Sequence, residues 1–128
     1  MGYLLDTNVA IHLRDGDPAV VQRVRALDDA VMMSIVTRVE LEGGVHRDPR
    51  YAAARRERLD LVLAAVPALA FDDADAAVHA EIVAAVGYSR RKLLDRMIAA
   101  QAVCHRATLV TFDVDDFREI PGLKLLAW

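Results

Sequence analysis

A short apolar run near the N-terminus ends abruptly in three polar residues, and this pattern constrains the fold more than any other in the chain. The run Tyr3–Leu5 is followed directly by Asp6, Thr7 and Asn8. Short apolar runs of this kind are typical of buried strands, and the polar residues mark where the strand leaves the core. In open α/β sheets, ligands bind outside the carboxyl ends of parallel strands. We therefore expect Asp6 to lie where such folds carry out their chemistry.

The rest of the chain alternates between strand-like and helix-like segments. Short apolar runs predict further strands at residues 31–35, 69–71, 108–112 and 123–128, whereas helical spacing predicts helices near 18–27, 37–43, 50–66, 72–87 and from 95 onward. The segment after Asn8, which contains His12 and Arg14, is expected to be a connection. This alternation implies parallel crossovers and an α/β fold whose sheet is covered on both faces. We expect one domain over residues 1–128, with no internal repeat.

Composition excludes several classes of protein. The 128 residues are 55% hydrophobic, enough to bury a core without disulfides, and the single cysteine, Cys104, fits a reducing cytoplasm. No signal peptide is recognisable, and the longest apolar run, residues 61–71, contains Pro67 and is shorter than the roughly 20 residues that span a bilayer. The net charge of −3 means that a polyanionic partner would need a local basic patch.

Acidic residues follow several of the predicted strands. Asp6 ends the first strand, Glu40 lies in the helix after the second, and Asp113 and Asp116 follow the fourth, so all should reach one edge of a parallel sheet. The position of Asp95 relative to that edge does not follow from spacing.

Each of these acids also has a purely structural interpretation. Asp6 could be a turn or cap residue, and Thr37 with Glu40 has the spacing of a capping box. Asp95 could complement a helix dipole, and the acids after the fourth strand could be solvated turn residues.

A cluster of such acids would be unstable unless something neutralised it. At an effective dielectric of ~20, two carboxylates ~5 Å apart repel by about 3 kcal/mol. The cluster persists by protonation, by pairing with cations, or by binding a divalent ion, and oxygen ligands with open positions suit Mg²⁺ or Mn²⁺. Such an ion activates water and stabilises a phosphoryl transition state. Thr7 and Asn8 could orient a carboxylate or the scissile phosphate.

Other candidate groups carry weaker signals. The four histidines have no zinc spacing, Cys104 is interpreted as a core residue, and no glycine-rich phosphate loop is present. The basic run Arg90, Arg91 and Lys92 is either a solvated turn or, because it lies close to Asp95, a contact for a nucleic-acid backbone.

Together these motifs resemble the PIN-domain ribonucleases, and most closely the VapC toxins of VapBC toxin–antitoxin systems. The resemblance covers nearly the whole chain. It is carried by the stretches LLDTN (residues 4–8), TRVEL (37–41), DRMIAA (95–100), LVTFD (109–113) with Asp116-Phe117, and IPGL (120–123).

This resemblance implies a three-layer α/β/α PIN-like fold with a central, mainly parallel sheet. It also implies a Mg²⁺- or Mn²⁺-dependent endoribonuclease that cuts RNA with metal-activated water. Asp6, Glu40 and Asp95 match three of the family's acids. Many members have Asn at the position of Asp113 and an acid at that of Asp116, whereas both are Asp here, so either could face the metal; we favour Asp113.

The resemblance further implies a homodimer and a cognate VapB-type antitoxin whose tail crosses the helices around residues 40–66 and blocks the acidic site. The apolar stripe from Leu59 to Val66 would serve that contact or belong to the core.

Three other functions remain open at the level of sequence. A haloacid-dehalogenase-type phosphatase would use Asp6 as its nucleophile, but it requires a second Asp where this chain has Asn8. A response-regulator receiver would need a phosphoacceptor Asp near mid-chain, where the sequence is helical and basic. A non-catalytic partner-binding module would keep the acids without binding metal.

Overall fold

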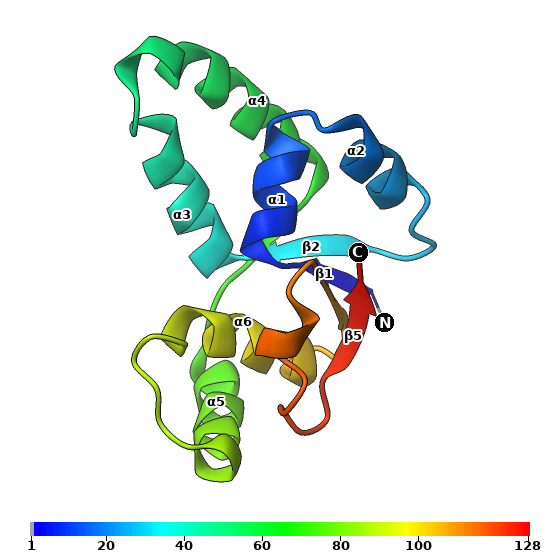
Figure 1. Ribbon diagram of the computed structural model, residues 1–128, viewed down its shortest axis with the longest axis vertical. Helices are drawn as coiled ribbons and strands as arrows, with labels where there is room; N and C mark the ends of the chain where they lie inside the picture. The colour runs from blue at the N-terminus through cyan, green and yellow to red at the C-terminus, as the bar shows by residue number, and fades with distance from the viewer. Residues whose placement is uncertain (1) are drawn as a thin grey trace.

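The computed structural model describes residues 2–128 (Figure 1). Five parallel strands form one sheet in the order β3-β2-β1-β4-β5. The first strand lies at its centre, between the second and the fourth, so the polar residues that follow it emerge at mid-sheet. The strands are β1 (Tyr3–Leu5), β2 (Val31–Ser34), β3 (Ala68–Leu69), β4 (Thr108–Thr111) and β5 (Lys124–Ala127).

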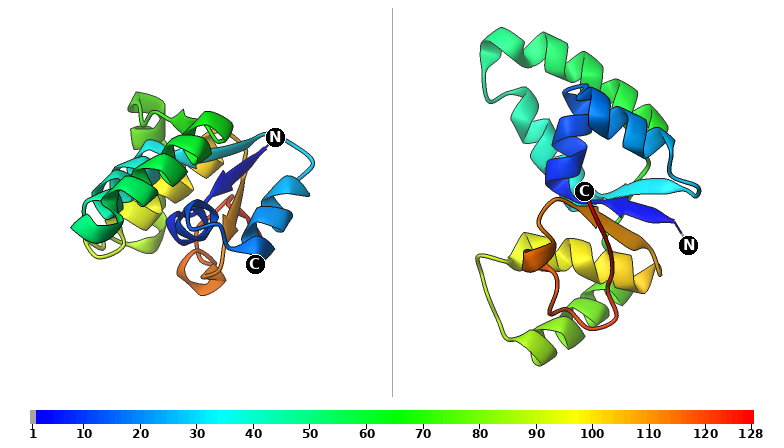
Figure 2. Two further views of the ribbon diagram at one scale, coloured as in Figure 1. Left: turned by 90° about the horizontal axis from the view of Figure 1, so that it is seen from above. Right: turned by 45° about the vertical axis from the view of Figure 1, so that its right-hand side comes forward.

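Helices cover both faces of this sheet, as Figures 1 and 2 show. The helices on one side are α1 (Thr7–Arg14), α2 (Pro18–Arg25), α3 (Ile35–Val45) and α4 (Ala52–Ala65), and those on the other are α5 (Asp73–Val86) and α6 (Leu93–Cys104). Two short 3₁₀ helices, η1 (Pro49–Tyr51) and η2 (Val114–Asp116), lie before α4 and after β4. The predicted three-layer, parallel α/β/α architecture is confirmed.

The two layers of helices correspond to two hydrophobic cores. Because successive side chains of a strand point to opposite faces, Leu4 packs in the core under α5 and α6, and Leu5 packs in the core under α1 to α4. Leu59 anchors α4 in the second core with none of its surface exposed. Replacing such a side chain by alanine costs about 2–5 kcal/mol, so α4 is firmly held.

The segment after Asn8 is helical, and the prediction of a connection there is wrong. Helix α1 begins at Thr7, directly after β1, and Asp6 is its N-cap, with its carboxylate accepting the backbone N–H of Thr7 at 2.9 Å. An Asp immediately after a strand can end that strand and start a helix with the same side chain.

The proposed capping box of Thr37 and Glu40 is also wrong. Helix α3 begins at Ile35, and its cap is Ser34, whose hydroxyl accepts the N–H of Val36 at 3.0 Å. Thr37 therefore lies inside the helix, fully buried. Glu40 is free of a capping role and stands one turn further along α3.

The predicted limits of α5 are confirmed. Asp72 caps its N-terminus in a reciprocal capping box with Asp75, and Gly87 ends it with a φ of 89°, a backbone conformation that favours glycine. None of the helices within residues 2–128 combines the length and the apolar character that crossing a membrane would require.

Candidate active site

The register of the sheet brings the end of β1 level with the ends of its two neighbours. Leu5 pairs with Val110 on β4 and with Met33 on β2. The next residues, Asp6, Thr111 and Ser34, therefore reach the carboxyl edge of the sheet together. This edge is where ligands bind in open α/β folds, as the sequence predicted.

A cavity of about 150 Å³ opens at this edge and is lined mainly by acids. It is smaller than the 300–1,000 Å³ typical of sites for drug-sized molecules, and it suits a small ion or part of a phosphate. All five predicted acids line it, including Asp95, whose position spacing alone did not give. The lining residues are Asp6, Thr7, Asn8, Ile11, Glu40, Asp95, Asp113, Asp116 and Phe117.

Asp6 is the most buried of these acids, with 5% of its surface exposed. Its Oδ1 accepts the N–H of Thr7 at 2.9 Å and its Oδ2 accepts the hydroxyl of Thr111 at 2.8 Å. Burial raises the pKa of Asp6 to about 6, and the charges of Asp95 and Asp113 act in the same direction, while the two hydrogen bonds oppose the rise. Asp6 is thus held in one orientation, and its ionised form is less stable in this cavity than in water, a cost that a bound cation would offset.

Thr7 connects α1 to α3. Its hydroxyl lies 2.9 Å from the Thr37 hydroxyl and donates to Glu40 Oε1 at 3.4 Å. The Thr7 hydroxyl uses its proton to donate to Glu40, so in the 2.9 Å contact between the two hydroxyls Thr37 is the donor and Thr7 the acceptor. The buried threonine pair therefore positions the Glu40 carboxylate, whose pKa is raised by partial burial and by the charge of Asp95.

Asn8 and Thr111 both act on Asp113. The Asn8 amide donates to Asp113 Oδ2 at 3.1 Å, and the Asp113 backbone N–H donates to Thr111 Oγ1 at 2.9 Å. Asp116 lies at the end of η2 and lines the same cavity. Both candidates for the fourth acid are therefore at the site, and of the two only Asp113 accepts a hydrogen bond from another side chain of residues 2–128.

Asp95 comes to the cavity from the first turn of α6. Its burial raises its pKa, followed in size by the charges of Asp116 and then Asp113, while Lys92 lowers it. The charges of other acids of the cavity contribute to the raised pKa of each of Asp6, Glu40 and Asp95, as expected for acids that line one cavity.

None of the five carboxylates of the cavity forms an ion pair with a cation of residues 2–128. The donor set is entirely oxygen, which fits Mg²⁺ or Mn²⁺. No three acidic, histidine or cysteine side chains of these residues are placed to hold one ion together. A site built from one or two carboxylates and water is the usual arrangement for Mg²⁺, so the residues present fit such an ion.

Thr111 and Thr37 are the site residues that sequence reasoning missed as functional groups. Thr111 is fully buried and lies two residues before Asp113. A signal for it exists in the sequence, since a polar residue ends the apolar run of the fourth strand at the same edge as Asp6. The role of Thr37 depends on which face of α3 meets α1, so no local pattern reveals it.

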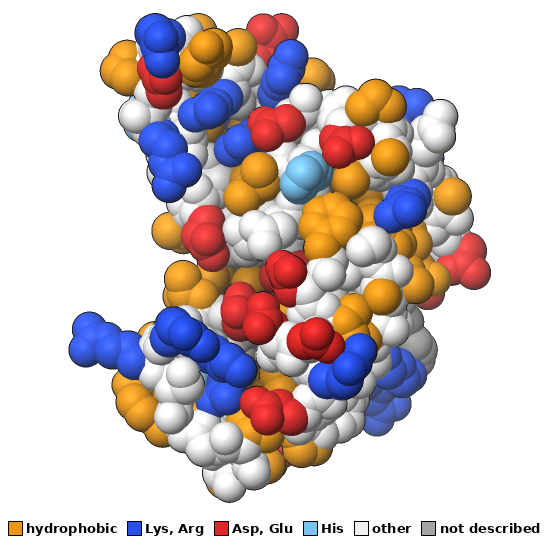
Figure 3. Space-filling view, in the orientation of Figure 1, with side chains coloured by type: hydrophobic (Ala, Val, Ile, Leu, Met, Phe, Trp, Pro, Cys, Tyr) orange, Lys and Arg blue, Asp and Glu red, His pale blue; other side chains and the backbone are white. Residues whose placement is uncertain are grey.

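Positive charge borders the acidic site on two sides. In the space-filling view of Figure 3, acidic side chains gather in the hollow between α3 and α6, and Lys and Arg side chains lie over α3 and α4 and over the loop before α6. That loop contains the predicted basic run, in which Arg90 and Arg91 are exposed and Lys92 is half-buried.

The whole chain also matches known proteins. The sequence pattern of the PIN domain matches residues 3–123. The chain is 25% identical to Ribonuclease VapC2 of Rickettsia felis over 135 residues, covering 100% of this chain and 98% of that protein.

Two solved assemblies have a similar fold. One is the VapBC2 complex of Rickettsia felis bound to a promoter DNA fragment, with a TM-score of 0.87, 24% identity and coverage of 100% and 99% of the two chains. The other is VapBC-1 from nontypeable Haemophilus influenzae, with a TM-score of 0.82, 26% identity and coverage of 100% and 98%.

Proposed function

The chain belongs to the PIN-domain family, and on that premise we propose that it is a divalent-metal-dependent endoribonuclease, the toxin of a toxin–antitoxin pair. The relative described above is a ribonuclease, and both solved assemblies are VapBC complexes. The observation that carries the proposal is the acidic cavity, in which carboxylates from distant parts of the chain meet without an ion-paired cation among residues 2–128.

Asp6 and Asp95 are the residues that would hold the ion, because they are the acids most affected by burial in the cavity. Glu40 and Asp113 or Asp116 would complete the set through water molecules bound to the ion, since no three of these side chains within residues 2–128 are placed to hold one ion directly. When bound, Mg²⁺ or Mn²⁺ supplies a water of lowered pKa and neutralises charge on a phosphodiester.

The neutral residues of the site orient these acids. Thr111 fixes the Asp6 carboxylate, Thr7 directs Glu40 into the cavity, and Asn8 does the same for Asp113. Asn8 is itself exposed, so its amide is also available to a phosphate oxygen of the RNA. Such outer hydrogen bonds contribute about 10- to 100-fold to metal affinity or activity in metalloenzymes.

The basic run Arg90 to Lys92 would contact the RNA backbone. Lys92 is close enough to Asp95 to lower the pKa of that acid, and Arg90 and Arg91 are exposed beside it. These cations would attract phosphates to a chain whose net charge is −3.

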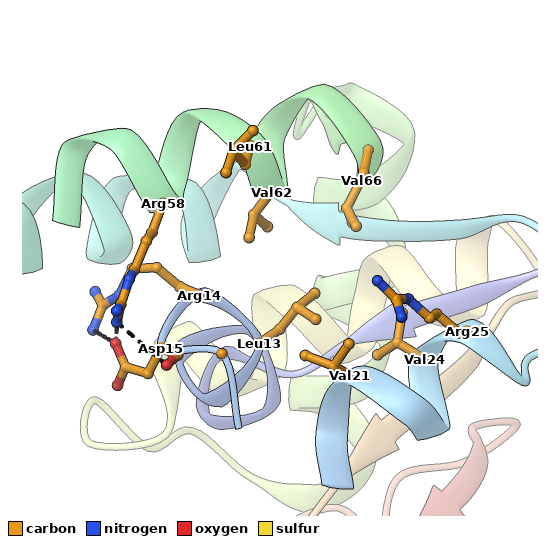
Figure 4. A pocket seen from close by; sticks show the side chains of 12 residues that line it. Leu13, Arg14, Asp15, Val21, Val24, Arg25, Arg58, Leu61, Val62 and Val66 are labelled. Atoms are coloured by element: carbon orange, nitrogen blue, oxygen red, sulfur yellow. Dashed lines mark hydrogen bonds and ion pairs between the residues drawn. The ribbon is translucent and has the colours of Figure 1, made fainter. Parts of the chain in front are cut away.

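The proposed antitoxin partner would dock in an apolar groove between α1, α2 and α4. Figure 4 shows Val21, Val24, Val62 and Val66 facing one another across this groove, which has a volume of about 500 Å³. Leu61 is 69% exposed beside it, whereas Leu59 of the same apolar stripe is buried core. Arg25 and Arg58 lie at its rim, so the groove suits an amphipathic segment with acidic flanks.

RNA cleavage by the purified chain tests the proposal. With Mg²⁺ present, Asp6→Asn and Asp95→Asn should each lower the rate of RNA cleavage by at least about 100-fold. Asp115→Asn is the matched control, because Asp115 is exposed, pairs with Arg118 and lies outside the cavity. Undiminished cleavage by the Asp6 and Asp95 variants would overturn the assignment.

Two further measurements separate the alternatives. A phosphorylated Asp6 trapped during turnover of a phosphate monoester would indicate a phosphatase of the haloacid-dehalogenase type. The homodimer that the resemblance implies stays a prediction, and light scattering on the purified chain tests it.

A further inference from the structure

We propose that a second cavity, lined by Arg14, Arg47 and Arg55, binds a further phosphate of the RNA, close to the phosphodiester that is cut. This inference rests on the proposed ribonuclease function and adds a binding subsite to it. The cavity has a volume of about 410 Å³, and its walls are Ile11, Arg14, Glu40, Gly43, Gly44, Arg47 and Arg55.

Arg14 forms the buried side of this cavity. It is the last residue of α1, and only 7% of its surface is exposed. Its Nε and Nη2 donate to Asp15 Oδ1 at 3.1 and 3.0 Å. Its Nη1 lies so close to α3 that a Cβ at Gly44 would come within 2.9 Å of it. The absence of a side chain at Gly44 thus lets a fixed, buried guanidinium form part of the cavity wall.

Arg55 and Arg47 form the outer side. The Arg55 guanidinium is held in place because its Nη1 donates to the Gly44 carbonyl at 3.0 Å and its Cζ lies 5.6 Å from the centre of the Tyr51 ring. Arg47 is exposed and follows the end of α3. The guanidinium groups come from three separate elements and converge on one hollow.

Two of the three arginines of the cavity, Arg47 and Arg55, form no ion pair with any of residues 2–128, whereas Arg14 is paired with Asp15. On α3, η1 and α4, Arg38, Arg50 and Arg56 are each paired with an acid. The one acid of the cavity, Glu40, is bonded to Thr7. The cavity therefore carries an uncompensated positive charge, which favours an anion.

The two cavities adjoin. Glu40 and Ile11 line both, so the arginine cavity begins where the acidic cavity ends. Along α1, Arg14 is eight residues from Asp6, which corresponds to about 12 Å. A nucleic-acid strand carries one charge every few ångströms, so an RNA placed at the acids has further phosphates within this distance.

A phosphodiester fits this cavity better than a free carboxylate does. Guanidinium groups bind phosphate through paired hydrogen bonds, and a strand can fill both cavities at once, which a single carboxylate cannot. In Figure 3 the cations over α3 and α4 lie directly beside the acidic hollow. An acidic segment of a protein partner is the competing occupant, and the experiment separates the two.

The test is RNA binding in an Asp95→Asn background, in which cleavage is suppressed. Arg47→Gln and Arg55→Gln should each weaken binding of a labelled single-stranded RNA roughly five- to tenfold, and each should reduce the slope of log K against log salt by about 0.7. Arg47→Lys keeps the charge and loses the paired hydrogen bonds, so it should weaken binding less than Arg47→Gln does. Arg50→Gln is the matched control, because Arg50 lies in η1, between Arg47 and Arg55 in the chain, but is paired with Asp48 and does not line the cavity.

Each outcome decides the proposal. Weaker RNA binding with an unchanged melting temperature supports the proposal. In the active chain, which keeps Asp95, Arg47→Gln should also raise KM for RNA with little change in kcat. Variants that bind RNA as tightly as their parent overturn the proposal, even if they bind an acidic peptide less well, since that result would assign the cavity to a protein partner. If the Asp95→Asn chain without a further substitution binds no RNA at all, the proposed ribonuclease function is overturned as well.

Discussion

The hydroxyl of Thr111 donates a 2.8 Å hydrogen bond to the carboxylate of Asp6, although 105 positions separate the two residues in the chain. The pairing follows from the register of β1 and β4, which places both residues at the same edge of the sheet. The same Thr111 oxygen accepts the backbone N–H of Asp113 at 2.9 Å. One buried hydroxyl therefore holds two of the acids in position.

Replacing Thr111 by valine should lower RNA cleavage by about 10- to 100-fold, because the Asp6 carboxylate loses the donor that orients it. That hydrogen bond also lowers the pKa of Asp6, so the acidic limb of the pH–rate profile should move to higher pH. Thr111→Ser keeps the hydroxyl and should restore both properties. A valine variant with the wild-type pH profile would contradict this role.

Asn8→Ala should lower kcat/KM by up to about tenfold, because it removes a hydrogen bond to the Asp113 carboxylate. The melting temperature should not change, since Asn8 is exposed. A double-mutant cycle checks the mechanism: Asn8→Ala added to Asp113→Asn should have little further effect. Fully additive losses would mean that Asn8 acts on something other than Asp113.

Asp6→Asn should stabilise the metal-free protein at neutral pH. The folded-state pKa of Asp6 is about 6 against an ordinary value of 3.8. The native state therefore binds this proton more tightly than the unfolded state, so stability falls as pH rises through 6. The ionised Asp6 carboxylate lowers the free energy of unfolding by about 3 kcal/mol at pH 7, and an uncharged asparagine side chain avoids this loss.

Thermal unfolding in EDTA measures this effect. The variant should melt several degrees higher than the wild type at pH 7.5, and the difference should disappear near pH 4, where Asp6 is protonated in the folded protein. An equal gain at both pH values would show that the stabilisation does not come from the charge of Asp6.

Mg²⁺ or Mn²⁺ should raise the melting temperature of the wild-type chain, because an ion that binds only the folded state stabilises it by about 2.7 kcal/mol at 100 times its Kd. Asp6→Asn and Asp95→Asn should lose most of this response, and Asp115→Asn should keep it. Calorimetry with Mn²⁺ that detects no site in the wild type would favour the non-catalytic alternative.

Leu61→Glu should weaken inhibition by the cognate antitoxin by at least about tenfold, because it places a charge in the apolar groove of α4. The melting temperature should be unaffected, since Leu61 is 69% exposed. Val39→Glu is the matched control: Val39 is 66% exposed but lies outside the groove. Equal inhibition of both variants would place the antitoxin elsewhere.

Local patterns in the sequence determined the strands, most of the helices and the identity of the acids. The run before Asp6 and the limits of the helix near residues 72–87 are properties of short segments, and the structure has them where they were predicted. Two local interpretations were wrong. The segment after Asn8 is helix α1 and not a connection, and Ser34 caps α3 in place of Thr37.

The sequence by itself determined which residues could carry the chemistry and that several of them would reach the carboxyl edge of a parallel sheet. Only the tertiary structure decided that Asp95 joins them, that Thr37 supports Glu40 through Thr7, and that Arg14, Arg47 and Arg55 share one cavity. The physical reason is that strand periodicity and caps depend on neighbours along the chain. The meeting of α1, α3, α4 and α6 depends instead on how their buried faces pack.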